Sequence, residues 1–144
     1  METEIEIKFF FNPHFADQLL AKISQYITIS HKDQMMYNVY FETPSNSLRK
    51  MDMGLRVRRI DDKCTQTIKT SGRVIGGLHQ RPEYNENIEG LHPELARFNS
   101  KIWPEGCDLE ELQASISPLF NTDFRRLHWL LEMQDGTLIE LAYD

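Results

Sequence analysis

The segment ETEIEIK, residues 2–8, alternates between charged and apolar side chains. Glu4, Glu6 and Lys8 share one parity, whereas Ile5 and Ile7 share the other. A period of two is typical of a β-strand, because successive side chains point to opposite faces of a sheet. Residues 2–11 are therefore predicted to form an N-terminal strand with one charged face and one apolar face.

Similar alternation returns further along the chain, between residues that favour turns. Strands are expected at about 34–42, 55–60, 65–70, 80–88, 123–133 and 137–144, with turns at Asp61-Asp62 and Asp135-Gly136. The three glycines between residues 71 and 77 predict a flexible loop that joins two strands.

Helical signals lie between these strands. Asn12 suits an N-cap and Pro13 the first helical position, which predicts a helix at about 13–26. Pro93 is expected to begin a short helix that ends before residue 104. Asp108 and Glu111 have the spacing of a capping box, so another helix should begin at about 109. The whole pattern predicts an α+β fold dominated by antiparallel strands.

Composition narrows the classes of function. The chain has 144 residues, enough for one domain with a core, and Lys plus Arg number 16 against 22 Asp plus Glu, a net charge of −6. An acidic chain argues against a nucleic-acid partner, although a local basic cluster could still hold a small polyanion. No membrane-length apolar run and no signal-peptide pattern occur, so no membrane partner and a cytoplasmic location are expected. The two cysteines should be free thiols.

Charged residues recur at alternate positions on the expected strands. The rows comprise Arg56 with Arg58, Lys69, Arg81 with Glu83, Arg126, and Glu140 with Asp144. The ordinary explanation is a solvated sheet face of mixed charge. Two observations favour a shared interior instead: the opposite faces are not consistently more apolar, and arginine, whose planar fork matches phosphate oxygens, is used repeatedly.

Such an interior would need a partner of opposite charge. Two cations about 5 Å apart repel by roughly 3 kcal/mol at an effective dielectric constant near 20. A polyphosphate would offset this repulsion, and nearby carboxylates would suit Mg²⁺ or Mn²⁺, which prefer oxygen ligands.

These motifs together resemble the CYTH domain of the triphosphate tunnel metalloenzyme superfamily. The ExExK pattern of Glu4, Glu6 and Lys8 is followed, in the family's order, by YFETP at 40–44, LRVR at 55–58 and TIK at 67–69. GGLHQRPEY at 76–84 and TDFRRLHW at 122–129 are similar to the bacterial inorganic triphosphatase branch. The resemblance extends over residues 1–144 as one domain.

The resemblance implies an antiparallel, barrel-like tunnel of eight strands with peripheral helices and an Mg²⁺ or Mn²⁺ cofactor. It also implies a role for each charged row. Glu4, Glu6 and Lys8 would be catalytic; Lys8, Arg56, Arg58, Lys69 and Arg126 would bind the triphosphate; Glu4, Glu6, Glu140 and Asp144 would hold the metal; and Glu83 would be a further acidic tunnel residue. Arg125 is expected to point away from the tunnel, by parity.

Members of the family continue beyond the strand that ends here at Asp144, with an acidic strand that completes the tunnel. The resemblance therefore implies a tunnel that is incomplete at the C-terminus. Two explanations stay open: a fragment with little activity, or a missing wall supplied by another chain, as in a homodimer paired through an exposed sheet edge.

Three functions remain open at this point, all with a small triphosphate-containing partner. The first is metal-dependent hydrolysis of inorganic triphosphate (tripolyphosphate) or a related triphosphate. The second is adenylate cyclase chemistry on ATP, and the third is non-catalytic polyphosphate binding. No segment is recognisable as an adenine pocket, which favours the hydrolase.

Overall fold

The computed structural model describes residues 1–144 of the chain, which form two compact units. Unit 1 comprises Met1–Ile7 and Met36–Asp123, and unit 2 comprises Lys8–Met35 and Phe124–Asp144. Strands β2 (Ile27–Glu42) and β7 (Ser117–Glu132) contribute residues to both units. The strand pairs of both units are antiparallel, which confirms the predicted α+β fold class.

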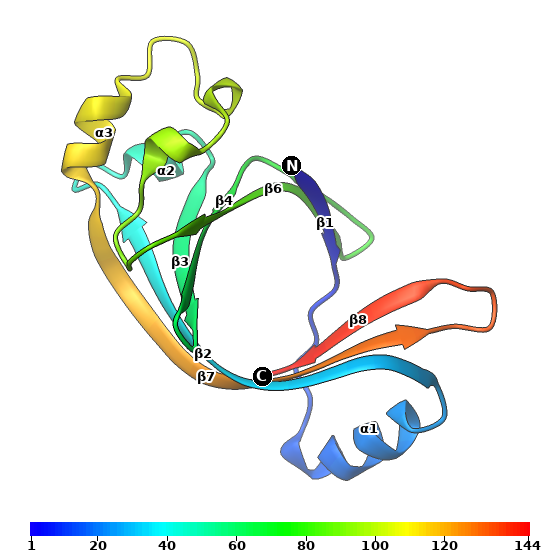
Figure 1. The fold of residues 1–144 in the computed structure, drawn as a ribbon. Helices are drawn as coiled ribbons and strands as arrows, with labels where there is room; N and C mark the ends of the chain where they lie inside the picture. Colours follow the sequence, from blue (N-terminus) through cyan, green and yellow to red (C-terminus); the bar gives the residue numbers. More distant parts are fainter. The chain divides into compact units, whose positions relative to one another are not determined.

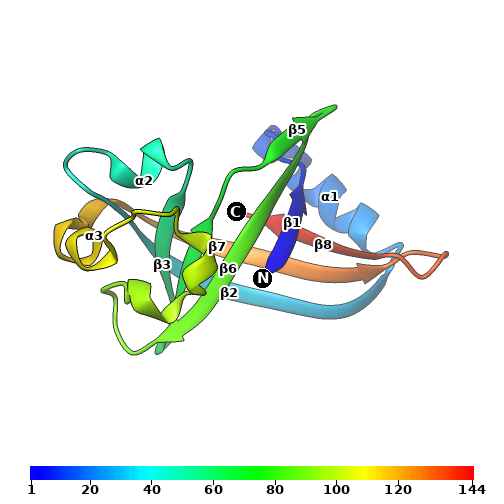
Figure 2. The ribbon, with the colours of Figure 1, turned by 90° about the horizontal axis from the view of Figure 1, so that it is seen from above.

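Unit 1 is built on an antiparallel sheet. Its strands follow the order β1-β6-β4-β3-β2, and β5 pairs with β6 beside this path. Figure 1 shows the sheet curving from β3 over β4 and β6 to β1, and Figure 2 shows the same strands from above. The strands that belong to unit 1 alone are β1 (Glu2–Glu6), β3 (Gly54–Ile60), β4 (Lys63–Lys69), β5 (Arg73–Ile75) and β6 (Leu78–Ile88).

The core of unit 1 lies on one face of this sheet. Leu55, Val57 and Ile68 are 2%, 0% and 0% exposed, and burial of each side chain contributes about 1.5–3 kcal/mol. Leu48 and Leu112 pack in the same cluster. They belong to the helices α2 (Ser47–Lys50) and α3 (Leu109–Ser115), which therefore cover the apolar face. Both cysteines are free, as predicted; Cys64 is buried in this cluster and Cys107 is half-buried at its edge.

Glu42 is a buried carboxylate that fixes the turn after β2. Its two oxygens accept hydrogen bonds from the backbone N–H groups of Thr43 (2.8 Å), Leu48 (3.0 Å) and Arg49 (3.0 Å). The sequence predicts a turn at 43–47 but neither the short helix α2 nor this role for Glu42. Since three donors satisfy the carboxylate, Glu42 stabilises the local structure of unit 1.

Unit 2 contains the 3₁₀ helix η1 (Pro13–Phe15), α1 (Ala16–Ile23) and β8 (Leu138–Tyr143). The Asn12 side chain accepts a hydrogen bond from the His14 N–H at 3.0 Å, which confirms the predicted cap. The helix ends at Ile23, three residues earlier than expected. Ile23 packs with Trp129 and Leu131 of β7 in a second apolar cluster.

Two strands begin earlier than predicted. Strand β2 begins at Ile27 and β7 at Ser117, instead of 34 and 123. Strand β7 includes Pro118, which cannot donate to the ladder but is tolerated because it lies near the beginning of the strand. No helix of the structure is both long and apolar enough to span a membrane.

The prediction of one short helix that begins at Pro93 is wrong. The segment instead forms two 3₁₀ turns, η2 (Leu95–Arg97) and η3 (Ser100–Ile102). Gln66 accepts from the Glu94 N–H and Gln113 from the Leu95 N–H, both at 2.8 Å. These long-range side-chain bonds satisfy the backbone in a conformation that is not α-helical.

The glycine-rich segment is also more ordered than predicted. Residues 73–75 form β5, which pairs with β6 through a turn at Gly76 and Gly77. These glycines have φ values of 57° and 82°, as a two-residue hairpin turn requires. The segment is thus a hairpin that joins two strands, as expected, but residues 73–75 form a strand instead of part of a flexible loop.

Candidate functional site

The second face of the unit 1 sheet is polar, and the strand register places its side chains together. Arg56 lies opposite Thr67, and Thr67 opposite Asn85. Residues directly opposite one another on antiparallel strands point to the same side. The same register places the predicted site residues of unit 1 on this side. We call this surface the polar face; it comprises Glu4, Glu6, Arg56, Arg58, Thr67, Lys69, Glu83 and Asn85.

An ion cluster forms where β1, β4 and β6 lie side by side. The Lys69 Nζ atom lies 2.5 Å from Glu4 Oε2 and 3.7 Å from Glu83 Oε2. The three side chains are only 15–31% exposed, so water screens this cluster less than an exposed pair. Three residues predicted from separate strands therefore meet here.

The arginines of β3 lie beside this cluster on the polar face. Arg56 Nη2 donates to Thr67 Oγ1 at 3.3 Å, whereas its Nε is buried and has no hydrogen-bond partner. An unsatisfied buried donor costs about 1–3 kcal/mol, and a small rearrangement toward a bound anion would offset that cost. Arg58 Nε donates to Asn38 Oδ1 at 2.7 Å, and Asn38 is completely buried.

Hydrogen bonds connect Arg56 to the ion cluster. Thr67 Oγ1 donates to Asn85 Oδ1 at 2.6 Å, and Asn85 Nδ2 donates to Glu83 Oε1 at 3.0 Å. Neither Thr67 nor Asn85 is among the predicted site residues. Their parity with Lys69 and Glu83 indicates that they lie on the same face of their strands. The hydrogen bonds themselves depend on the register between strands.

The remaining predicted residues, Lys8, Arg126, Glu140 and Asp144, belong to unit 2. Lys8 is exposed. Arg126 forms a two-pronged pair with Asp144, with Nε–Oδ1 and Nη2–Oδ2 distances of 2.6 and 2.8 Å. The Glu140 carboxylate lies 3.9 Å from His128 Nε2. Strands β7 and β8 pair, so Arg126, His128, Glu140 and Asp144 lie on one face of this hairpin. Trp129 lies on the opposite face.

Arg125 has a separate, more exposed partner. Its guanidinium pairs with both oxygens of Asp33, and the two side chains are 63% and 47% exposed. This hydrogen bond lowers the pKa of the Asp33 carboxyl and raises the pKa of Arg125. The pKa of Asp135 is also lowered, because its carboxylate accepts a hydrogen bond from the Thr137 N–H.

The polar face offers suitable ligands for a hard cation. Glu4 and Glu6 lie two residues apart on the same side of β1, and both are half-buried. No group of three or more His, Cys, Asp or Glu side chains gathers closely enough to form a complete protein cage. This donor set fits Mg²⁺, which usually binds through one or two carboxylates and completes its shell with water and phosphate oxygens.

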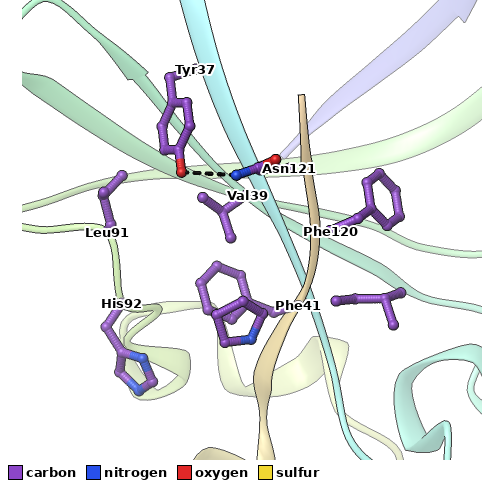
Figure 3. A pocket seen from close by; sticks show the side chains of 9 residues that line it. Tyr37, Val39, Phe41, Leu91, His92, Phe120 and Asn121 are labelled. Carbon is purple, nitrogen blue, oxygen red and sulfur yellow. Dashed lines mark hydrogen bonds between the residues drawn. The ribbon is translucent and has the colours of Figure 1, made fainter. Parts of the chain in front are cut away.

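An apolar pocket of unit 1 does not overlap this site. It has a volume of about 470 Å³, and Figure 3 shows its lining. Tyr37, Val39 and Phe41 reach it from β2 and share the parity that pairs with Leu55 and Val57, on the apolar face. No lysine or arginine lines the pocket, so it does not suit a polyanion.

The unit 1 sheet is curved and antiparallel, and acidic and basic side chains interleave on its polar face, as the resemblance to the CYTH domain predicts. The family comparison agrees: residues 2–144 match the CYTH domain, and the chain belongs to that family. An inorganic triphosphatase from Haemophilus influenzae is 38% identical over 146 residues. The alignment covers 100% of this chain and 40% of that protein, so the chain spans less than half of its relative's length.

Solved structures show the same fold at low sequence identity. A candidate adenylyl cyclase from Hippeastrum, described as having a dominant triphosphatase activity, is 20% identical with a TM-score of 0.68. The match covers 99% of this chain and 72% of the Hippeastrum chain. A candidate adenylate cyclase from Vibrio parahaemolyticus is 15% identical with a TM-score of 0.52, over 99% of this chain and 75% of its own.

Proposed function

We propose that this chain binds tripolyphosphate or a related triphosphate on the polar face and hydrolyses it with a divalent metal. The observation that carries this proposal is the convergence of Arg56, Arg58 and Lys69 with Glu4 and Glu83 on one face of the sheet. Full-length similarity of this chain to a protein named inorganic triphosphatase supports the same reaction.

The basic side chains would bind and orient the substrate. Arg56 and Arg58 offer planar forks that match two phosphate oxygens each, and Lys69 adds a compact positive charge. Phosphoryl transfer depends mainly on such positioning and charge neutralisation, since the protein need not form a covalent intermediate. Glu83 would hold Lys69 in place through their 3.7 Å ion pair.

Glu4 and Glu6 would hold Mg²⁺ or Mn²⁺ and take part in catalysis, and a catalytic role for Lys8 remains a prediction. When bound, the metal would polarise phosphoryl oxygens and orient water for in-line attack. Substrate binding by Arg126 and metal binding by Glu140 and Asp144, all in unit 2, remain predictions from the family resemblance. A cytoplasmic location and a homodimer paired through a sheet edge remain predictions.

The cyclase alternative has less support. An adenylate cyclase must hold the adenine ring of ATP as well as its triphosphate. The apolar pocket that could accept such a ring lies on the opposite face of the unit 1 sheet from the polar face. Hydrolysis needs no such pocket.

The direct test supplies the chain with tripolyphosphate and Mg²⁺ or Mn²⁺, and measures phosphate release. A parallel reaction with ATP is analysed for cyclic AMP. We expect phosphate from tripolyphosphate and no cyclic AMP. Cyclic AMP as the main product would replace the hydrolase proposal with the cyclase.

A second test separates hydrolysis from simple binding. Glu4→Gln and Glu6→Gln keep the shape of each side chain but remove its charge. Turnover should fall by about 10²-fold or more, whereas metal-free binding of tripolyphosphate, measured by calorimetry, should change far less. Tight binding by the wild type without any turnover would identify a non-catalytic polyphosphate binder.

A further inference from the structure

We propose that Thr67 and Asn85 are positioning residues, which aim the Arg56 guanidinium at the substrate and connect it to the ion cluster of Glu83, Lys69 and Glu4. The inference rests on the proposed function, because it assigns these residues a role in triphosphate binding on the polar face. Nothing in the alternating charge pattern identifies them, since both are uncharged.

Thr67 occupies the centre of the connection. It is 2% exposed, and its Cα partners on the flanking strands are Arg56 on β3 and Asn85 on β6. A threonine hydroxyl has one hydrogen and two lone pairs. The hydrogen goes to Asn85 Oδ1 at 2.6 Å, so a lone pair is left to accept from Arg56 Nη2 at 3.3 Å.

Asn85 continues the chain in the same direction. Its oxygen accepts from Thr67, so its amide nitrogen faces Glu83 Oε1, at 3.0 Å. The other oxygen of Glu83 lies 3.7 Å from Lys69 Nζ, which also bonds Glu4 at 2.5 Å. Arginine can only donate and a carboxylate can only accept, so the direction of every bond from Arg56 to Glu83 is determined.

This arrangement restrains one corner of the Arg56 fork. An arginine side chain has many rotamers, and recognition of phosphate oxygens requires its planar donors to be correctly oriented. The bond to Thr67 holds Nη2, while the buried Nε has no partner within the protein. Thr67 therefore acts through Arg56 without itself being required to touch the substrate.

The test compares Thr67→Val, which keeps the shape and removes the hydroxyl, with Thr67→Ser, which keeps the hydroxyl. We expect Thr67→Val to raise KM for tripolyphosphate about tenfold with a smaller change in kcat, and Thr67→Ser to stay within about threefold of the wild type. Thr65→Val is the matched control: Thr65 lies two residues away on β4 and bonds Asn87. The Thr65→Val variant should change KM for tripolyphosphate by less than about twofold.

A double-mutant cycle distinguishes positioning from a merely structural role. In an Arg56→Ala background, Thr67→Val should raise KM by less than about twofold, because its effect passes through Arg56. An equal rise in KM in both backgrounds would overturn the inference. So would a KM for Thr67→Ser as high as that of Thr67→Val. Asn85→Ala should show the same dependence on Arg56, with a smaller effect.

One readout does not depend on substrate. The NMR signal of the Arg56 Nε–H should be sharp in the wild type and in Thr67→Ser, and broadened or exchanged faster in Thr67→Val. An unchanged signal would contradict the positioning role even if tripolyphosphate is hydrolysed. A wild type that fails to bind tripolyphosphate while the signal responds as expected would instead contradict the proposed function.

Discussion

Strands β3 and β4 carry two opposite surfaces on the same backbone. On one face Leu55, Val57 and Ile68 are almost completely buried, and on the other Arg56 and Lys69 belong to a charged, hydrogen-bonded network. Burial of the apolar face stabilises the fold, whereas the polar face holds half-buried charges that need partners. Stability and anion binding should therefore respond to different residues, although these alternate along each strand.

Charge reversal on the polar face should have the largest effect. Arg56→Glu combined with Arg58→Glu replaces two attractions for phosphate by two repulsions, each about 3 kcal/mol at 5 Å and a dielectric constant near 20. We expect kcat/KM for tripolyphosphate to fall by about 10³-fold or more. Arg59→Glu is the control on the same strand, because Arg59 is exposed and its guanidinium lies over the Tyr37 ring. An equal loss in the control would show a general charge effect.

Truncation of a side chain on the apolar face should lower the stability of the fold instead. Leu55 is 2% exposed, and Leu55→Ala should reduce the free energy of unfolding by about 2–5 kcal/mol through lost burial and a cavity. Urea denaturation measures the loss. Activity per folded molecule should be nearly unchanged, and a large fall in kcat of the folded fraction would break the proposed separation.

Gln66 is a buried polar residue on the apolar side of β4, so it can be used to test whether polar residues of both faces serve the site. Its amide pairs with both the N–H and the C=O of Glu94, at 2.8 and 2.9 Å, and its side chain is completely buried. Gln66→Leu should cost about 1–3 kcal/mol of stability by leaving these backbone groups unpaired. Tripolyphosphate KM should stay the same; a raised KM would mean that polar residues of both faces serve the site.

The smallest effect is expected at the exposed Arg125–Asp33 pair of unit 2. Because the pKa of Asp33 is lowered below 3.8 in the folded state, its ion pair stabilises the protein above that pH and is lost as pH falls through the folded pKa. The stability difference between wild type and Asp33→Asn should therefore shrink on acidification below about 3.8. Denaturation at a series of pH values measures it, and a difference that grows in acid would contradict this sign.

The sequence predicts the two faces well, because alternation is a property of single strands. The parity of Arg56, Lys69 and Glu83 assigned each of them to the charged face of its own strand. That these faces form one surface was an expectation from the family resemblance, and the strand register confirms it. The hydrogen bonds through Thr67 and Asn85 were not predictable in this way. They depend on which residue of β4 lies opposite which residue of β6, and single-strand patterns do not specify that register.

The secondary-structure errors have a similar origin. The segment after Pro93 carries helical signals of its own, but Gln66 and Gln113 bond its backbone from distant parts of the sequence. Strand β7 begins at Ser117 and continues through Pro118, although proline has no N–H to donate to the ladder. In each case a contact between distant residues outweighs the local propensity.

Cys64 can serve as a natural probe of local unfolding in unit 1. Its thiol is 6% exposed within the core cluster of unit 1, whereas Cys107 is half-buried. A thiol reagent should therefore modify Cys107 in the native state but reach Cys64 only when the strands around it separate. The rate of the slower modification would measure how often this region opens, without the introduction of any label.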